Sequence, residues 1–176
     1  MDSRHILTAS HCLFDEYGIQ HDPSKSYVLA GAHDLPVMGC LGDKWGQQIQ
    51  ALSFHGHEDY DMNNIDNDIA IVRLAEEIVI NSKAKPIKLP MNTTIQNNQD
   101  STVTGWGETL PQKHGKAAKL TPSLKHVSCQ LKEANLALMK STEKKCSDMI
   151  VTNPETKLCA FTSGVDSCQG DSGKNV

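Results

Sequence analysis

Residues 166–173 of the 176-residue chain read DSCQGDSG, and this stretch decides how the remaining sequence is interpreted. A serine hydroxyl is a weak nucleophile until a base takes its proton, and the oxyanion that its attack creates needs hydrogen-bond donors already in place. Glycine on either side of the Asp-Ser pair allows the backbone turn that presents such N–H donors. The tetrapeptide GDSG alone is equally typical of a surface turn, but the eight-residue string is far more specific. We therefore interpret Ser172 as a candidate nucleophile, and expect its base and an orienting carboxylate elsewhere in the chain.

The sequence supplies both partners beside apolar segments. His11 lies near the end of ILTASHC (6–12), where a ring that follows an expected strand can project into a cleft. Asp68 precedes the apolar run IAIVRL (69–74), at the mouth of an expected buried strand where a carboxylate can be desolvated. Only a tertiary fold can bring three residues so far apart together. Their order along the chain, His, Asp and Ser, is one of the three known orders of the Ser-His-Asp triad.

Several short segments rich in Ile, Val, Leu and Thr, separated by proline and glycine, predict an all-β chain. The expected strands are residues 4–9, 27–30, 48–54, 69–74, 102–106, 124–131 and 158–161. Residues 132–145, KEANLALMKSTEKK, combine good helix formers with Ala134 and Leu138 at i, i+4, and predict one short helix. The polar, amide-rich segment 88–99, KLPMNTTIQNNQ, is expected to cross between two sub-domains.

The overall composition argues against two classes of partner. The net charge is −4, the pI is about 6.0, and the lysines are spread through loops without interleaved aromatic residues, so no nucleic-acid partner is expected. No stretch approaches the roughly 18 apolar residues of a membrane span, so no membrane partner is expected. The first residues, MDSRHILTAS, lack the charged and long apolar regions of a signal peptide.

Six cysteines occur at wide, irregular spacings without a Cys-x-x-Cys pair, which favours disulfides over zinc or redox sites. They are Cys12, Cys40, Cys129, Cys146, Cys159 and Cys168. The sequon Asn92-Thr93-Thr94 fits an oxidising, extracellular environment, although an unmodified polar loop has about equal weight. We expect a secreted, extracellular protein whose signal peptide is not present in this chain.

Four motifs together resemble the chymotrypsin/trypsin family of serine proteases. LTASHC (7–12) is similar to the family's Leu-Thr-Ala-Ala-His-Cys, with Ser10 for the second Ala, and NDIAIVRL (67–74) is similar to its Asn-Asp-Ile-Ala-Leu strand. VTGWG (103–107) and DSCQGDSG match two further landmarks in the same order, so the likeness extends from residue 4 to residue 173. The resemblance implies an all-β fold of two antiparallel β-barrels, here incomplete, divided into residues 1–91 and 92–176.

The same resemblance assigns a role to each matching residue. His11 would be the general base and later the general acid, Asp68 its orienting partner, and Ser172 the nucleophile. The backbone N–H groups of Gly170 and Ser172 would form the oxyanion hole, and Asp166 would lie at the floor of the specificity pocket. A buried carboxylate there selects Lys or Arg, because a neutral side chain would leave it unpaired. The implied function is trypsin-like endopeptidase activity through an acyl-enzyme, with protein or peptide substrates and protein inhibitors as partners.

The sequence also departs from the family pattern. Lys174 and Asn175 follow GDSG where the family has glycine and proline. The family's free N-terminal amine and its closing strands have no counterpart, and the acid that would receive the amine is Asp171. A buried carboxylate without its partner costs about 3–5 kcal/mol. We therefore expect a domain truncated at both ends and inert by itself. The alternative interpretation is a catalytically inactive homologue that serves as a binding or regulatory module.

For the cysteines, the resemblance pairs Cys146 with Cys159 and gives Cys12 and Cys168 partners outside the present sequence. Cys40 and Cys129 do not match the common pattern, and a bridge between them is one possibility.

Three other sites are excluded by their residues. An α/β-hydrolase elbow, Gly-x-Ser-x-Gly, has Lys174 in place of the second glycine. A thiol dyad of Cys12 and His11 is not expected, because neighbours on a strand point to opposite faces. The EF-hand-like run from Asp59 lacks the required glycine and bidentate glutamate, with Asn64 and Ala70 in their places. Neither a metal nor a cofactor is therefore expected.

Overall fold

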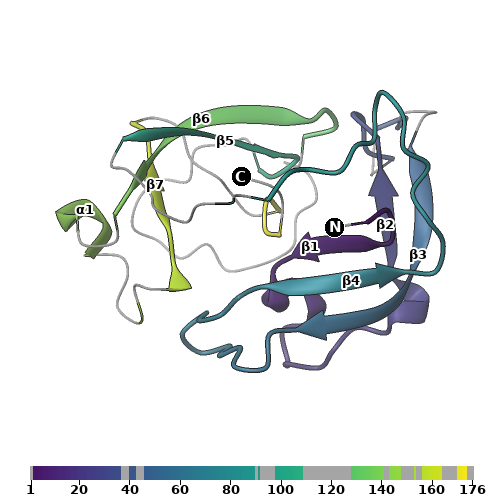
Figure 1. Ribbon diagram of the computed structural model, residues 1–176, viewed down its shortest axis with the longest axis horizontal. Coiled ribbons are helices and arrows are strands. Elements are labelled where there is room, and N and C mark those ends of the chain that lie inside the picture. Colours follow the sequence, from purple (N-terminus) through teal and green to yellow (C-terminus); the bar gives the residue numbers. More distant parts are fainter. Residues whose placement is uncertain are drawn as a thin grey trace.

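The computed structural model describes residues 2–36, 40–42, 46–89, 91, 98–108, 128–140, 143–147, 153, 156–163 and 170–173. Within these ranges the chain consists mostly of antiparallel strands arranged in two sheets, with very little helix (Figure 1). The first sheet is curled into a half-barrel, and the second lies beside it. This architecture confirms the all-β prediction and fits an incomplete pair of β-barrels.

The first sheet has the strand order β1-β4-β3-β2. Its strands are β1 (His5–Thr8), β2 (Tyr27–Ala30), β3 (Gln47–Gly56) and β4 (Ala70–Leu74). Short 3-10 helices, η1 (Ser10–Leu13) and η2 (Pro23–Lys25), follow β1 and precede β2. The register of β3 against β4 shifts between Ala51 and Ser53. An irregularity of this kind bends a strand and increases its twist, which helps the sheet to curl.

Alternating side chains build the core of this sheet. Along β4, Ala70, Val72 and Leu74 are buried while the residues between them are exposed, the period of two expected for a half-buried strand. They pack with Leu13, Ile49 and Ala51 in one cluster. Burying a Val or Leu side chain stabilises the fold by about 1.5–3 kcal/mol. The two strands that flank the 57–69 connection, β3 and β4, are therefore firmly fixed.

The second sheet has the strand order β5-β6-β7, with β6 in the centre. Its strands are β5 (Gln99–Gly105), β6 (Lys132–Met139) and β7 (Cys159–Phe161), and a single turn of helix, α1 (Lys144–Ser147), lies between β6 and β7. All strands of the first sheet precede residue 91 and all strands of the second follow it. The domain boundary at 91/92 stays a prediction, because residues 92–97 lie outside the described residues.

The prediction of a helix over residues 132–145 is wrong. Residues 132–139 form β6, and only Lys144–Ser147 are helical. Ala134 and Leu138 fit a helix at i, i+4, but Ala134, Leu136 and Leu138 also fit a strand at i, i+2, and Leu136 is buried. Pairing with strands on both sides outweighs a helix preference of a few tenths of a kcal/mol per residue.

The strand expected over residues 124–131 is not found in the part that is described. Residues 124–127 lie outside the described ranges, and residues 128–131 precede β6. The other six expected strands are confirmed, with ends that differ by a few residues.

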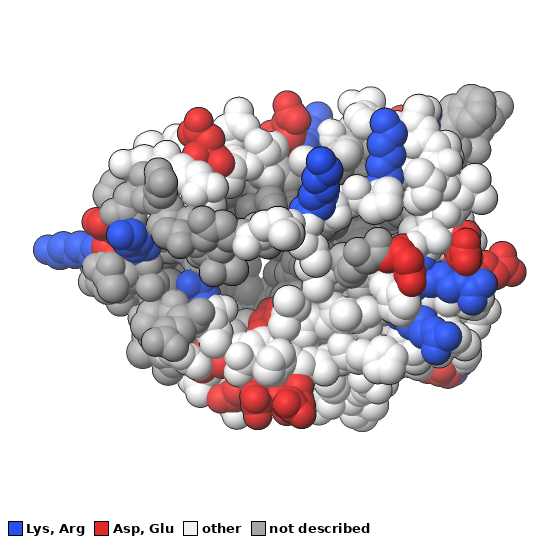
Figure 2. Space-filling view, in the orientation of Figure 1, with Lys and Arg blue, Asp and Glu red and all other residues white. Residues whose placement is uncertain are grey.

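The surface carries both signs of charge. On the face seen in Figure 2, basic and acidic side chains are interspersed over both halves of the molecule, with an acidic group along the lower edge. Among the described residues, no helix has the length and apolar character needed to cross a bilayer.

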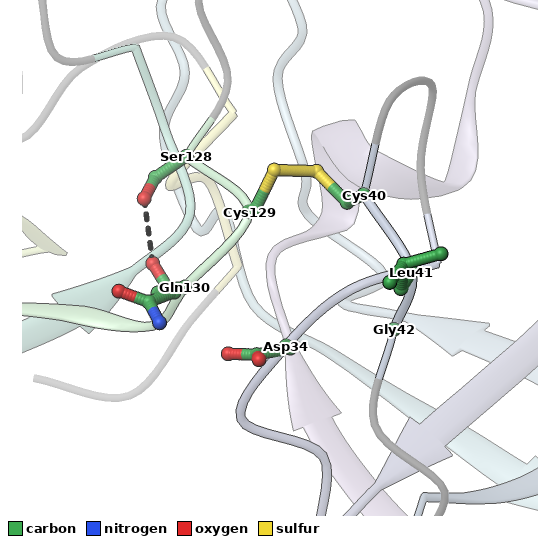
Figure 3. Close-up of a pocket in the computed structure, with 7 residues that line it drawn as sticks. All are labelled: Asp34, Cys40, Leu41, Gly42, Ser128, Cys129 and Gln130. Atoms are coloured by element: carbon green, nitrogen blue, oxygen red, sulfur yellow. Dashed lines mark hydrogen bonds between the residues drawn. A yellow bond between two sulfur atoms is a disulfide. The ribbon is translucent and has the colours of Figure 1, made fainter.

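Two disulfides cross-link the described residues. Cys146–Cys159 joins α1 to the start of β7 and confirms the pairing that the resemblance implied. Cys40–Cys129 joins the first half of the chain to the second, so the possible bridge between them is confirmed. Cys168 lies outside the described residues. A pocket of about 490 Å³ adjoins the Cys40–Cys129 bridge, and none of the predicted site residues lines it (Figure 3). Its lining residues are Asp34, Cys40, Leu41, Gly42, Ser128, Cys129 and Gln130.

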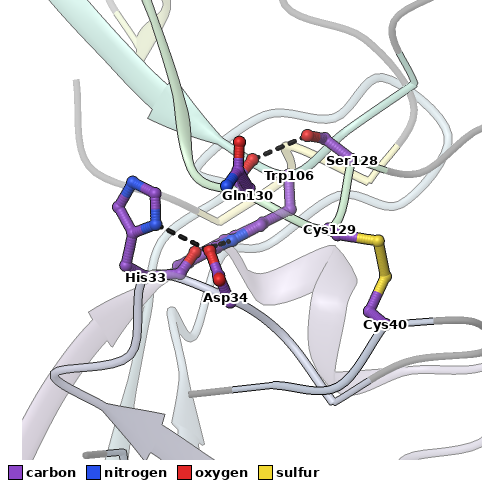
Figure 4. Close-up of a disulfide and its surroundings, with 7 residues drawn as sticks. All are labelled: His33, Asp34, Cys40, Trp106, Ser128, Cys129 and Gln130. Atoms are coloured by element: carbon purple, nitrogen blue, oxygen red, sulfur yellow. Dashed lines mark hydrogen bonds and ion pairs between the residues drawn. A yellow bond between two sulfur atoms is a disulfide. The ribbon is translucent and has the colours of Figure 1, made fainter.

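Hydrogen bonds join the two halves beside this disulfide, in a region that we call the seam. Figure 4 shows the disulfide with His33, Asp34, Trp106 and Gln130 around it. The seam consists of His33, Asp34, Leu35, Trp106 and residues 129–131. The N–H of Leu35 donates to the Cys129 carbonyl at 2.9 Å, and the N–H of Leu131 donates to the His33 carbonyl at 2.9 Å. The indole N–H of Trp106 donates to the same His33 carbonyl at 2.9 Å. The two sheets are thus held together by hydrogen bonds and by a covalent bond.

Candidate active site

His11 is held by the tight turn that follows β1. The chain leaves the sheet at Thr8 and enters η1, where Ser10 is completely buried. The Ser10 hydroxyl donates to the Ile69 carbonyl at 2.7 Å and accepts from the His57 backbone N–H at 3.4 Å. Ser10 therefore fastens the His11 turn to both ends of the connection that carries Asp68. In the sequence Ser10 was noted only as a departure from Ala, and a hydroxyl in that small-residue position is the signal that could have identified this role.

The Asp68 carboxylate binds His11 at two points. Its Oδ2 lies 2.6 Å from the ring Nδ1, and its Oδ1 accepts from the His11 backbone N–H at 2.8 Å. The Asp68 side chain is 18% exposed and that of His11 is 37% exposed. A carboxylate at this distance requires the proton to be on Nδ1, which leaves the lone pair on Nε2. The imidazole is thus fixed in the tautomer and orientation of a general base.

Cys12 lies close to the other ring nitrogen of His11. Its Sγ is 3.5 Å from Nε2. The expectation that His11 and Cys12 point to opposite faces of a strand is wrong, because both belong to η1, where neighbouring side chains diverge less than on a strand. The sulfur of Cys12 therefore lies on the Nε2 side of the ring.

The loop before Asp68 is held in shape by backbone and side-chain hydrogen bonds within the loop itself. Asp61 and Asp66 pair through two backbone hydrogen bonds, with N···O distances of 3.1 and 3.2 Å. The Asp61 carboxylate accepts from the side-chain amide of Asn64 at 2.7 Å and from the backbone N–H of Asn63 at 2.8 Å. These bonds, first the side-chain one to Asn64 and then the backbone one to Asn63, lower the pKa of Asp61. Asp68 therefore lies two residues after a small hairpin, residues 61–66, that these hydrogen bonds close.

The segment that contains Ser172 is anchored on two sides. On one side, the Gly107 N–H donates to the Asp171 carboxylate at 2.7 Å, and a Cβ at position 107 would collide with that carboxylate. On the other side, the Thr8 hydroxyl donates to the Gly173 carbonyl at 3.4 Å. Gly173 has φ of 72°, and a Cβ there would collide with the Thr8 hydroxyl. Residues 170–173 therefore lie between the end of β5 and the end of β1.

Not every predicted residue is joined to the others. Ser172 is exposed, and within the described ranges no hydrogen bond links its hydroxyl to the His11 ring. Gly170 has φ of 94°, a backbone conformation that favours glycine. Asp166 lies outside the described residues. The structure thus brings His11 and Asp68 together and carries Gly173 to the strand that precedes His11, while the roles of Ser172, Gly170 and Asp166 stay predictions.

Two further residues support the site. Thr8 and Gly107 hold the Ser172 segment from opposite sides, although in the sequence they stood out only as parts of the motifs LTASHC and VTGWG. Tyr60 stacks on Phe14 with ring centroids 6.0 Å apart, and its hydroxyl is buried without a hydrogen-bond partner among the described residues. Burial, followed by the charge of Asp68, raises the pKa of Tyr60.

Comparison with known proteins gives a consistent result. The family model described as Trypsin matches residues 1–174. Trypsin beta of Drosophila erecta is 30% identical over 97% of this chain and 58% of its own length, and Trypsin-1 of Astacus astacus is 30% identical over 98% and 65%. The CLIP domain-containing serine protease B15 of Anopheles gambiae is 28% identical over 98% of this chain and 47% of its own length. The chain thus spans about half to two thirds of the length of these relatives. Because the family match extends over nearly the whole sequence and not over one motif alone, this chain belongs to the trypsin family of serine proteases.

Proposed function

We propose that this chain is the catalytic part of a serine endopeptidase that hydrolyses peptide bonds after Arg or Lys. The observation that carries the proposal is the double contact of Asp68 with His11, at 2.6 Å to the ring and 2.8 Å to the backbone. A simple surface ion pair would need only one such contact. Two contacts fix both the position and the tautomer of the imidazole.

In the proposed mechanism, Nε2 of His11 takes the proton of the Ser172 hydroxyl while Oγ attacks the carbonyl carbon of the scissile peptide. The carbonyl oxygen becomes an oxyanion, which accepts hydrogen bonds from the backbone N–H groups of Gly170 and Ser172. His11 then gives its proton to the leaving amine, the C–N bond breaks and an acyl-enzyme remains. Water, deprotonated by His11, attacks the ester, and Ser172 leaves with the proton. Asp68 stabilises the imidazolium in both steps.

The anchoring of residues 170–173 supports the role of Ser172. Its two neighbours, Asp171 and Gly173, are bound to Gly107 and Thr8, so the serine lies on a segment fixed from both ends. Losing one oxyanion donor costs about 10²–10³ in kcat, so the backbone at Gly170 needs this support.

The specificity and the location of the protein rest on the resemblance and on the cysteines. Asp166 would select Arg or Lys through a charge-assisted hydrogen bond. Two disulfides indicate an oxidising compartment, and we infer a secreted protein that acts on protein substrates and is regulated by protein inhibitors.

The test is turnover by the native protein that contains this chain. We expect cleavage of Arg- and Lys-ester substrates, with the same substrates carrying Phe cleaved much more slowly. Ser172→Ala is expected to abolish turnover, and Asp166→Ser to remove the preference for basic residues while leaving the fold intact. Turnover that survives Ser172→Ala would contradict the proposal.

Two observations keep other functions testable. The exposed Ser172 hydroxyl, not hydrogen-bonded to His11 within the described ranges, favours a non-catalytic homologue that acts as a binding module. The Cys12 thiol 3.5 Å from Nε2 favours a thiol nucleophile. A binding module would show no turnover at all, and a thiol enzyme would lose activity in Cys12→Ser and keep it in Ser172→Ala.

A further inference from the structure

We propose that Lys157 is a positioning residue for Asp68 and acts across the interface between the two sheets. This inference rests on the proposed function. The ammonium Nζ of Lys157 lies 2.7 Å from the Asp66 carboxylate Oδ1 and 2.7 Å from the Asn64 backbone carbonyl. Lys157 belongs to the second half of the chain, whereas Asp66 and Asn64 belong to the hairpin that delivers Asp68.

Lys157 links the second half of the chain to the hairpin that precedes Asp68. It lies two residues before Cys159, which begins β7 and is bound to Cys146. Its backbone therefore lies two residues from a cross-linked position at the edge of β7. The two charged groups are partly desolvated, since 21% of the Lys157 side chain and 14% of the Asp66 side chain are exposed. A pair this sheltered is screened less by solvent than an exposed surface pair, whose worth is about 0–1 kcal/mol.

Within the hairpin, a displacement of Asp66 also displaces Asp68. Asp66 is two residues from Asp68, and its backbone is bonded to that of Asp61. Between and beside these residues, Ile65 and Asn67 have positive φ values of 55° and 54°. A β-branched residue in this region is strained and is held there by its surroundings. A loop of this kind has few alternative conformations, so a shift of Asp66 also shifts the carboxylate two residues on.

Loss of Lys157 would leave an uncompensated carboxylate. The Asp66 side chain, which is 14% exposed when Lys157 is present, would lose its cation, and this favours movement of the hairpin toward water. The Asn64 carbonyl would lose its ammonium donor at the same time. Both changes pull the hairpin away from the second sheet, and therefore pull Asp68 away from its contact with His11.

The experiment compares three lysine variants of the native protein. In Lys157→Met we expect kcat/KM to fall roughly 10- to 100-fold, mostly in kcat, since a displacement near 1 Å costs about 10²-fold. Lys157→Arg should retain most of the turnover, because the guanidinium keeps both the charge and the donors. Lys132→Met, at an exposed position on β6 in the same sheet, serves as the matched control and should have no effect.

A second readout does not depend on turnover. The proton on His11 Nδ1, in a 2.6 Å contact with a carboxylate, should give a low-field NMR signal in the parent protein. We expect Lys157→Met to broaden or remove this signal and Lys157→Arg and Lys132→Met to keep it. If the parent protein has no peptidase activity, the proposed function fails, yet this signal still tests the role of Lys157.

Asp66→Asn completes the experiment as the partner variant. It should lower kcat as Lys157→Met does, and the double variant should be no worse than either single one, because both remove the same interaction. The inference is overturned if Lys157→Met lowers only the melting temperature while kcat and the Nδ1 proton signal stay at their parent values. Additive losses in the double variant would also overturn it.

Discussion

The two sheets reach their geometry by different means. In the first sheet, six buried apolar residues form one cluster, and the turn that carries His11 is bonded directly to the connection that carries Asp68. In the second sheet and the adjoining α1, the buried hydrophobic side chains within the described ranges are two aliphatic ones and a pair of bonded cysteines: Val103, Leu136, Cys146 and Cys159. The first sheet is thus organised by packing, and the second depends more on cross-links and on contacts with the first.

This difference matters for the proposed chemistry. The proposed base, His11, and the carboxylate that contacts it, Asp68, lie in the half that is organised by its own core, so their contact follows from folding of that half. The Ser172 segment depends on Gly107 from one sheet and Thr8 from the other. Its geometry therefore depends on how the two halves meet. Substitutions in the first sheet, in the seam and in the second sheet should therefore change turnover and the free energy of unfolding by different amounts.

The largest effect is expected from Asp68→Asn. The amide oxygen can still accept from the His11 backbone, but its N–H₂ group faces Nδ1 and forces the proton onto Nε2. With the base in the wrong tautomer, kcat/KM should fall about 10⁴-fold with little change in melting temperature. Asp100→Asn, an exposed carboxylate on β5, is the control. Near-parental turnover in Asp68→Asn would show that the contact between His11 and Asp68 is not needed for peptide hydrolysis.

The next effect concerns the two disulfides. Their cysteines are 89 and 13 residues apart, and the chain-entropy model gives about 4.5 kcal/mol for a loop near the first size and about 3 kcal/mol for one near the second. Replacing both Cys40 and Cys129 by Ser should therefore destabilise the protein more than replacing both Cys146 and Cys159. Chemical denaturation measures both. The reverse order would mean that the second sheet, and not the seam, depends most on its cross-link.

Matched leucine truncations compare the cores themselves. Leu74 is completely buried within the cluster of the first sheet, whereas Leu136 is 6% exposed with fewer buried apolar neighbours among the described residues. Leu→Ala changes cost about 2–5 kcal/mol according to how many contacts are lost, so Leu74→Ala should cost near 4 kcal/mol and Leu136→Ala near 2 kcal/mol. If urea unfolding gives the same loss in free energy of unfolding for both variants, the two cores do not differ in the way proposed.

The smallest effect is a gain in stability. In the part of the chain that the structure describes, the buried Tyr60 hydroxyl has no hydrogen-bond partner, so Tyr60→Phe should raise the free energy of unfolding by about 1 kcal/mol at neutral pH. Because burial raises the pKa of Tyr60, the unfolded chain releases this proton first, and stability falls as the pH rises above about 10. Tyr60→Phe should remove this part of the alkaline loss. Thermal melts from pH 8 to pH 11 give the comparison, and a lower melting temperature for Tyr60→Phe at neutral pH would show that the hydroxyl contributes to the fold.

The sequence predicted those parts of the molecule whose signal is local. The apolar run IAIVRL (69–74) indicated β4, and the motif contexts of His11 and Asp68 identified the pair that the structure brings together. Residues 132–139 were misassigned because two periodicities fit the same apolar residues, and the choice between them lies in the neighbouring strands.

The remaining features depend on contacts between distant segments. No spacing rule pairs Cys40 with Cys129, and nothing beside Lys157 in the sequence points to Asp66. The turn at η1 overrides the strand-like sequence around Cys12, which is why its side chain lies on the same side as the His11 ring. Such features follow from tertiary structure, and a single sequence does not encode them in any short pattern.

Covalent labelling tests the central claim most directly, namely that His11, Asp68 and Ser172 act as one unit. A fluorophosphonate probe is applied to the native protein and the modified peptide is identified by mass spectrometry. The account predicts one label on Ser172, lost in His11→Ala, strongly reduced in Asp68→Asn, and retained in Cys12→Ser. A properly folded protein that carries no label on Ser172, or a label on Ser172 that is indifferent to His11→Ala, would contradict it.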